Sequence, residues 1–187
     1  MRRLVLHVLA TAMVLGLAPA LPANADDVVC RGVIGPKTVD DNIRVPRGAT
    51  CTLKGTTVGG NVFVKRGAIL RAIGARIEGN VQAKRAKNVI IRARAFVDGD
   101  VQMERGRRGR VVRSRVEGNI QLKAQRGRLR VVRNVVDGDV QAFSNRGGVV
   151  IRGNRIDGNL QCKSNRPAPV GGNNRVSGNK EGQCKRL

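Results

Sequence analysis

The sequence predicts an all-β fold, a parallel β-helix or solenoid in which one chain winds into about seven to eight stacked coils. Three observations support this prediction. A short phrase returns every 19 or 20 residues, apolar and polar residues alternate within it, and a second β-rich run follows it in each repeat. A period this constant indicates that each repeat buries its apolar side against its neighbours.

The repeated phrase contains an apolar residue, a polar residue, glycine, asparagine or aspartate, another apolar residue and, in most repeats, glutamine. Alternation on both sides of the Gly-Asn or Gly-Asp pair favours two short strands joined by a corner. We expect the pair to supply the positive-φ residues that a tight corner needs. The phrases begin at Val39, Val58, Ile77, Val97, Val116, Val136, Ile156 and Val176.

The second run of each repeat is rich in β-branched residues, as in AILRA, NVIIRA, RVVRS, LRVVRN and VVIRG. Such residues favour an extended, pleated conformation. No repeat contains about ten residues with a helical period, so solenoids that contain helices fit poorly. In a parallel β-helix, equivalent residues of adjacent coils lie about 4.8 Å apart.

Residues 1–25 have the features of a secretory signal peptide. Two arginines precede an apolar run from Leu4 to Leu17, and an A-x-A cleavage site ends at Ala25. The run is too short for a membrane anchor, and no later stretch approaches about 18 apolar residues. We therefore expect a secreted product, released or held at the cell envelope by other contacts. The only histidine, His7, would leave with this segment.

The repeats and the C-terminal segment resemble those of a known group of proteins. The carriers are the G-[ND]-[VIL]-Q phrases and the terminal stretch IDGNLQCKSNRPAPVGGNNRVSGNKEGQC. On these, the chain from about Val39 onward resembles the right-handed parallel β-helix repeat proteins, most closely uncharacterised secreted members of actinobacterial type. The resemblance implies a right-handed, single-stranded helix and no assigned activity. A left-handed hexapeptide helix is the structural rival, but its coils contain multiples of six residues.

We expect one domain after the signal peptide, residues 26–187. It would comprise an N-terminal cap (26–38), the repeats (39–166) and a C-terminal cap (167–187).

Four cysteines remain in a chain expected to reach an oxidising compartment, so disulfides are the favoured interpretation. Four cysteines allow three pairings. Cys30 and Cys51 are 21 residues apart, and Cys162 and Cys184 are 22 apart, each close to one period. We therefore predict bridges Cys30–Cys51 and Cys162–Cys184, one at each end, where they would hold the caps closed.

In a stacked solenoid, equivalent positions form columns. The column after the corner glycine predicts a structural ladder, because stacked amides can hydrogen-bond to one another. Its members are Asn61, Asn80, Asp100, Asn119, Asp139, Asn159 and Asn179.

Two further columns have structural interpretations. The acidic column contains Glu78, Asp98, Glu117, Asp137 and Asp157, and the position two residues earlier is often arginine. We expect a solvated salt-bridge stripe, with calcium binding as the less favoured alternative because a line of carboxylates offers no cage. The glutamine column favours stacking between coils over binding of a polysaccharide chain. It contains Gln82, Gln102, Gln121, Gln141 and Gln161.

An arginine row is the most suggestive feature of the surface. Counted from the start of each phrase, arginine occurs at position +8 in the first four repeats and at +10 in the next three. In water, adjacent guanidinium groups repel by about 1 kcal/mol per pair, and a linear polyanion would reverse the sign of this energy. The hypothesised polyanion-binding residues are Arg47, Arg66, Arg85, Arg105, Arg126, Arg146 and Arg166.

The overall charge agrees with such a partner. With 36 Lys and Arg against 13 Asp and Glu, the formal net charge is +23, which favours polyanionic partners. A GC-rich genome also enriches Arg, Gly, Ala and Val, and the two explanations are not exclusive.

These features favour a non-catalytic, monomeric binding or scaffold protein of the cell envelope that needs no cofactor or metal. Its expected partner is an anionic polysaccharide or a teichoic-acid-like polymer. Nucleic acid would bind only non-specifically, because the chain has three Phe and no Trp or Tyr for base stacking.

An enzyme of the polysaccharide lyase or hydrolase type is one alternative. The near-constant repeat length leaves no long loops for a cleft, no histidine remains as a base, and no catalytic residue can be named. A self-assembling structural protein resembling the bactofilins is the other, but the stapled ends and the like charge argue against end-to-end growth.

Overall fold

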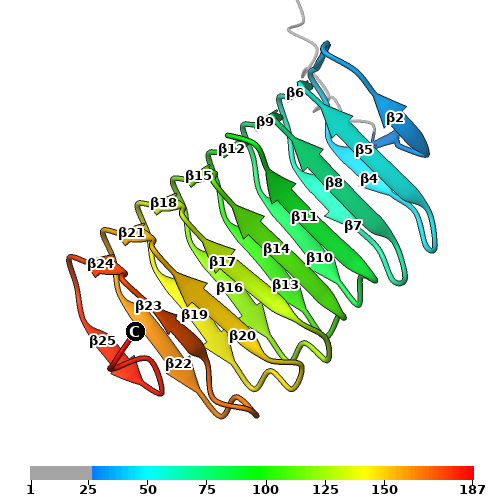
Figure 1. Ribbon diagram of the computed structural model, residues 1–187. Coiled ribbons are helices and arrows are strands. Elements are labelled where there is room, and N and C mark those ends of the chain that lie inside the picture. Colours follow the sequence, from blue (N-terminus) through cyan, green and yellow to red (C-terminus); the bar gives the residue numbers. More distant parts are fainter. Residues whose placement is uncertain (1–26) are drawn as a thin grey trace, which may run out of the picture.

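The computed structural model describes residues 27–187, and the predicted signal peptide lies outside the described residues. The chain winds into a parallel β-solenoid of about eight turns, and Figure 1 shows its coils stacked from β2 at one end to β25 at the other. In each coil the chain visits three parallel sheets in the order A, B, C. The predicted all-β solenoid is therefore confirmed.

The three sheets run along the whole solenoid. Sheet A contains β1 (Val28–Val29), β4 (Ile43–Val45), β7 (Val62–Val64), β10 (Val81–Lys84), β13 (Val101–Glu104), β16 (Ile120–Lys123), β19 (Val140–Phe143), β22 (Leu160–Lys163) and β25 (Lys180–Gly182). Sheet B contains β2 (Gly32–Ile34), β5 (Thr50–Lys54), β8 (Ile69–Ile73), β11 (Asn88–Arg92), β14 (Arg108–Val112), β17 (Leu129–Val132), β20 (Val149–Arg152) and β23 (Val170–Gly172). Sheet C contains β3 (Thr38–Val39), β6 (Thr57–Val58), β9 (Arg76–Ile77), β12 (Phe96–Val97), β15 (Arg115–Val116), β18 (Val135–Val136), β21 (Arg155–Ile156) and β24 (Arg175–Val176).

The register between coils matches the period of the sequence. Val81 pairs with Val62 of the preceding coil and with Val101 of the following one. The repeated phrase spans the corner from sheet C to sheet A, and the second β-rich run forms sheet B. Paired strands reach into both segments that the sequence assigned to caps, since β2 pairs with β5 and β23 with β20.

The core is a column of aliphatic side chains inside the coils. Along β10, Val81 and Ala83 are buried whereas Gln82 and Lys84 are exposed. This alternation follows from the two-residue period of a strand. Because the inside of each coil stacks on the next, Val, Ile, Leu and Ala fill the interior from end to end.

The corner glycines have a different role from the one expected. None of the glycines of the C-to-A corners, such as Gly79 and Gly118, has a positive φ. Instead, a Cβ at Gly79 would lie 2.8 Å from the backbone carbonyl of Gly60 in the preceding coil. Glycine is needed there because the backbones of successive corners approach closely, so the expectation of positive φ at this corner was wrong.

The column after these glycines forms the hydrogen-bonded ladder. The backbone N–H of Asn80 donates to Oδ1 of Asn61 at 2.9 Å, and that of Asp100 donates to Oδ1 of Asn80 at 2.8 Å. The pattern continues to Asn179, whose N–H donates to Oδ1 of Asn159 at 2.9 Å. Asn42 adds one rung at the start.

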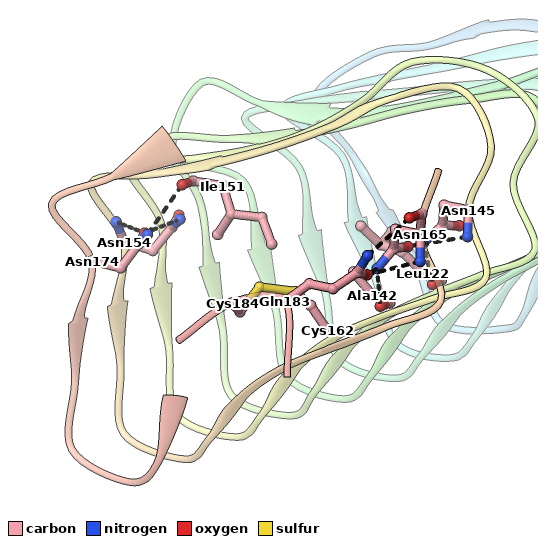
Figure 2. The surroundings of a disulfide bond; sticks show 10 residues. All are labelled: Leu122, Ala142, Asn145, Ile151, Asn154, Cys162, Asn165, Asn174, Gln183 and Cys184. Atoms are coloured by element: carbon pink, nitrogen blue, oxygen red, sulfur yellow. Dashed lines mark hydrogen bonds between the residues drawn. A yellow bond between two sulfur atoms is a disulfide. The ribbon is translucent and has the colours of Figure 1, made fainter. Parts of the chain in front are cut away.

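Two additional asparagine ladders, which were not predicted from the sequence, are buried inside the other two sets of turns. Asn134, Asn154 and Asn174 lie in the B-to-C turns, where Nδ2 of Asn154 donates to the carbonyl of Val131 and to Oδ1 of Asn174, both at 2.9 Å. Asn145 and Asn165 lie in the A-to-B turns, and the ladder ends on Gln183, as Figure 2 shows. Among the described residues, no buried side-chain nitrogen or oxygen lacks a partner.

Both predicted disulfides are confirmed. Cys30 bonds to Cys51 near the first coil, and Cys162 bonds to Cys184 near the last. Figure 2 shows the second bridge between the two buried asparagine ladders. Each bridge joins neighbouring coils, because its two cysteines are 21 or 22 residues apart.

Candidate functional site

The seven arginines of the predicted row all lie in the turns from sheet A to sheet B, and all are exposed. We call these residues the Arg edge: Arg47, Arg66, Arg85, Arg105, Arg126, Arg146 and Arg166.

The Arg edge consists of two columns rather than one line. Arg66 and Arg85 stack, because the N–H of Gly67 donates to the carbonyl of Arg85 at 2.8 Å. This first column, from Arg47 to Arg105, continues with small residues such as Ala124. Its last two arginines, Arg85 and Arg105, have φ values of 57° and 53°.

The second column contains the later arginines of the edge. The N–H of Arg146 donates to the carbonyl of Gln125, and the N–H of Arg166 donates to that of Asn145, both at 2.8 Å. The same pattern places Arg107 directly below Arg126. The later turns therefore carry their arginine two residues further on, beyond the buried Gln125, Asn145 or Asn165, so the +8 and +10 positions form two separate columns.

Few carboxylates neutralise the Arg edge. Nε of Arg105 lies 3.1 Å from Oε1 of Glu104, and this is the one ion pair of the edge among residues 27–187. Three sheet A strands, β10, β16 and β22, end in exposed lysines close to these turns, Lys84, Lys123 and Lys163. The edge is thus a strip of solvated cations with little internal compensation.

Sheet C shows the opposite arrangement, with arginines and carboxylates paired. Arg115 contacts Asp137 at 2.6 Å and Glu117 at 3.6 Å, and Arg76 contacts Glu78 at 3.5 Å. Arg76 also lies over the ring of Phe96, 4.4 Å from its centroid. Four of the five carboxylates of the acidic column thus lie in the expected salt-bridge stripe, and Asp98 has no arginine partner among the described residues.

The glutamine column lies on the outer face of sheet A. Gln141 donates to Gln161 at 3.0 Å, and Gln161 donates to Glu181 at 3.1 Å. Gln102 instead donates to Asp100 at 3.1 Å, so only part of the column forms a continuous amide ladder.

Charge is therefore segregated between the sides of the solenoid. The carboxylates of residues 27–187 lie on sheets A and C, at the corner between them and close to the N-terminus. The strands of sheet B and the turns that flank them contain Lys and Arg but no Asp or Glu. The sequence predicted the cations of the A-to-B turns but not the basic face of sheet B, although arginines recur in the second β-rich run.

Within the described part of the chain, no three His, Cys, Asp or Glu side chains come together as a metal-binding group. That part also contains no helix of the length and hydropathy needed to cross a membrane. Comparison of the chain with protein-family models, curated proteins and solved structures found no match.

Proposed function

We propose that this chain is a non-catalytic binding protein that engages an anionic polymer through the Arg edge. The observation that carries the proposal is the placement of seven exposed arginines in one set of turns, with a single carboxylate partner among the described residues. Arginine offers paired N–H donors that match phosphate and carboxylate oxygens.

The electrostatics favour an external partner. Within each column of the Arg edge, stacked coils place the backbones of successive arginines about 4.8 Å apart, where like charges repel by roughly 1 kcal/mol per pair in water. A linear polyanion lying along the solenoid would replace this repulsion with attraction at successive coils. Release of its counterions would add to the affinity and make it depend on salt.

The chemistry of the edge selects among polymers. Phe63 and Phe143 lie on the outside of sheet A and Phe96 on the outside of sheet C, so no aromatic side chain lies on the edge. A teichoic-acid-like phosphate polymer or an acidic polysaccharide fits better than single-stranded nucleic acid, which relies on base stacking.

The disulfides fit an oxidising compartment. Together with the predicted signal peptide, they support secretion of a monomer that works at the cell envelope. The repeated phrases support a place among the secreted β-helix proteins of actinobacterial type.

The test is retention of the purified protein, lacking residues 1–25, on isolated cell wall and on defined polyanions across a salt series. The edge variant carries Arg66, Arg85, Arg105, Arg126 and Arg146→Gln. The control variant loses the same charge from sheets A and C through Arg44, Arg76, Arg115, Arg155 and Arg175→Gln.

We expect the edge variant to lose at least tenfold in affinity and the control variant to bind nearly as the unmodified protein does. Retention should also differ among polymers of equal charge density. Equal losses in both variants would mean that the protein responds to net charge alone, and the Arg edge would not be a site.

A further inference from the structure

The outer face of sheet B carries a repeated pairing of arginine with a β-branched aliphatic residue. Five consecutive strands, from β8 to β20, each place one of each kind two residues apart on this face. The pairs are Arg71 and Ile73, Ile90 and Arg92, Arg110 and Val112, Arg130 and Val132, and Val150 and Arg152.

Register between strands arranges these pairs as a grid. One outward column contains, as successive partners, Arg71, Ile90, Arg110 and Arg130. The adjacent outward column contains, as successive partners, Ile73, Arg92, Val112 and Val132. Cations and aliphatic groups therefore alternate both along the strands and across part of the sheet.

The face has no internal counter-charge. Its strands contain no Asp or Glu, and no ion pair between residues 27 and 187 involves an arginine of the grid. The column of Arg71 ends on Val33 and Val170, two residues that are 70% and 60% exposed. Solvent-facing aliphatic residues and unpaired cations thus occupy the same surface.

An open hollow of about 550 Å³ lies over the middle of this face. Three aliphatic residues, Ile90, Val112 and Val132, line it together with four arginines of the grid. A partner that fills it must present both anionic groups and apolar groups.

We propose that the outer face of sheet B docks on the surface of an anionic lipid bilayer. The dimensions of the face favour a flat partner. A single polymer strand can follow one column of cations, whereas a grid that is two columns wide and several strands long matches a two-dimensional array of anionic headgroups. Eight strands spaced about 4.8 Å apart give a face about 34 Å long.

Both kinds of side chain contribute to this docking. Arginines close to an anionic bilayer each raise partitioning by roughly fivefold. The aliphatic side chains between them gain by leaving water for the boundary between headgroups and acyl chains. This inference does not rest on the Arg edge, because the edge lies in the adjacent turns and its proposed ligand is a linear polymer.

The test is co-sedimentation with large unilamellar vesicles of phosphatidylcholine, with and without about one-third phosphatidylglycerol. The buffer contains about 0.1 M salt, which screens exposed charges more than about 10 Å apart. The face variant carries Arg71, Arg92, Arg110 and Arg130→Gln. The aliphatic variant carries Ile90, Val112 and Val132→Thr, which keeps the charge and the preference for strands. Circular dichroism confirms that both remain folded, since all seven side chains point outward.

We expect the unmodified protein to sediment with the anionic vesicles and to stay in solution with phosphatidylcholine alone. The face variant should lose at least 50-fold in partitioning, the aliphatic variant about fivefold, and the edge variant less than threefold. Partitioning of the face variant equal to that of the unmodified protein would overturn the proposal. Loss of binding to polyanions but not to vesicles in the face variant would also overturn it and assign the face to a polymer.

Discussion

At the scale of single residues, asparagine and glycine set the shape of each turn. Asn61 and Asn80 belong to a ladder at the partly exposed corner, whereas Asn154 belongs to a buried one, where it is 1% exposed. Replacing a buried amide lowers the free energy of unfolding more than replacing an exposed one, because water cannot hydrogen-bond to the polar groups that lose their partner. The two kinds of ladder should therefore respond differently to substitution.

Asn154→Leu should lower the free energy of unfolding by about 2–4 kcal/mol. The change removes the acceptor of the Asn134 N–H, one of the two acceptors of Asn134 Nδ2, and the side-chain donor to the carbonyl of Val131. Asn179→Leu, at the exposed end of the corner ladder, should cost less than about 1 kcal/mol. Chemical denaturation measures both, and equal losses would contradict the distinction between the ladders.

Gly118→Ala should destabilise the protein by about 1–3 kcal/mol. Its Cβ would lie 2.7 Å from the carbonyl carbon of Gly99 in the preceding coil. Gly35→Ala is the matched control, because a Cβ there meets nothing within 4 Å and its φ is not positive. A thermal midpoint that falls equally for both variants would argue against close stacking of the corners.

The sequence could predict the corner ladder because it lies inside the aligned phrase. The sequence could not show why the corners need glycine, because a positive φ and a close approach between backbones both select glycine. The buried ladders of Asn134 and Asn145 lie outside the phrase, in turns whose length varies. Their signal was asparagine recurring at intervals of 20 residues, at Asn134, Asn154 and Asn174.

At the scale of elements, the two basic surfaces differ in how the strands and turns position them. The Arg edge depends on which position of the A-to-B turn carries the arginine, and the change of that position between Arg105 and Arg126 divides the edge into two columns. The grid of sheet B depends only on strand register, which is uniform. The sequence showed that apolar and polar residues alternate in the second β-rich run. That this run forms sheet B, with one face exposed, could be recognised only once all three sheets were placed.

The salt-bridge stripe of sheet C should contribute little to stability. Arg115→Gln removes contacts with Glu117 and Asp137, but the arginine side chain is 50% exposed. Exposed pairs are typically worth about 0.2–1 kcal/mol. Urea denaturation at low and high salt should show a loss below about 1 kcal/mol that shrinks further with salt. A salt-independent loss several times larger would mean that the stripe is structural.

At the scale of the whole molecule, the solenoid behaves as a row of coils that contact only their neighbours. The two disulfides lie near its ends, where each coil has one neighbour instead of two. The sequence predicted this arrangement because each cysteine pair is separated by nearly one period.

Replacement of Cys162 and Cys184 by serine should loosen the C-terminal coils selectively. Closing a loop of about 20 residues is worth roughly 3 kcal/mol, and its loss acts on the coils nearest the bridge. Hydrogen exchange should speed up in β22 to β25 and stay unchanged in β10 to β13. Equal acceleration throughout would show that the solenoid unfolds as one unit.

The central claim is that the Arg edge binds an anionic polymer, and the salt dependence of binding to a polyphosphate of defined length tests it most directly. Each cation that contacts the polymer contributes about 0.7–0.9 to the slope of the logarithm of the binding constant against the logarithm of salt concentration. We predict that the edge variant loses about three or more units of slope, whereas the control variant loses less than one. Equal slopes for the two variants would contradict the account.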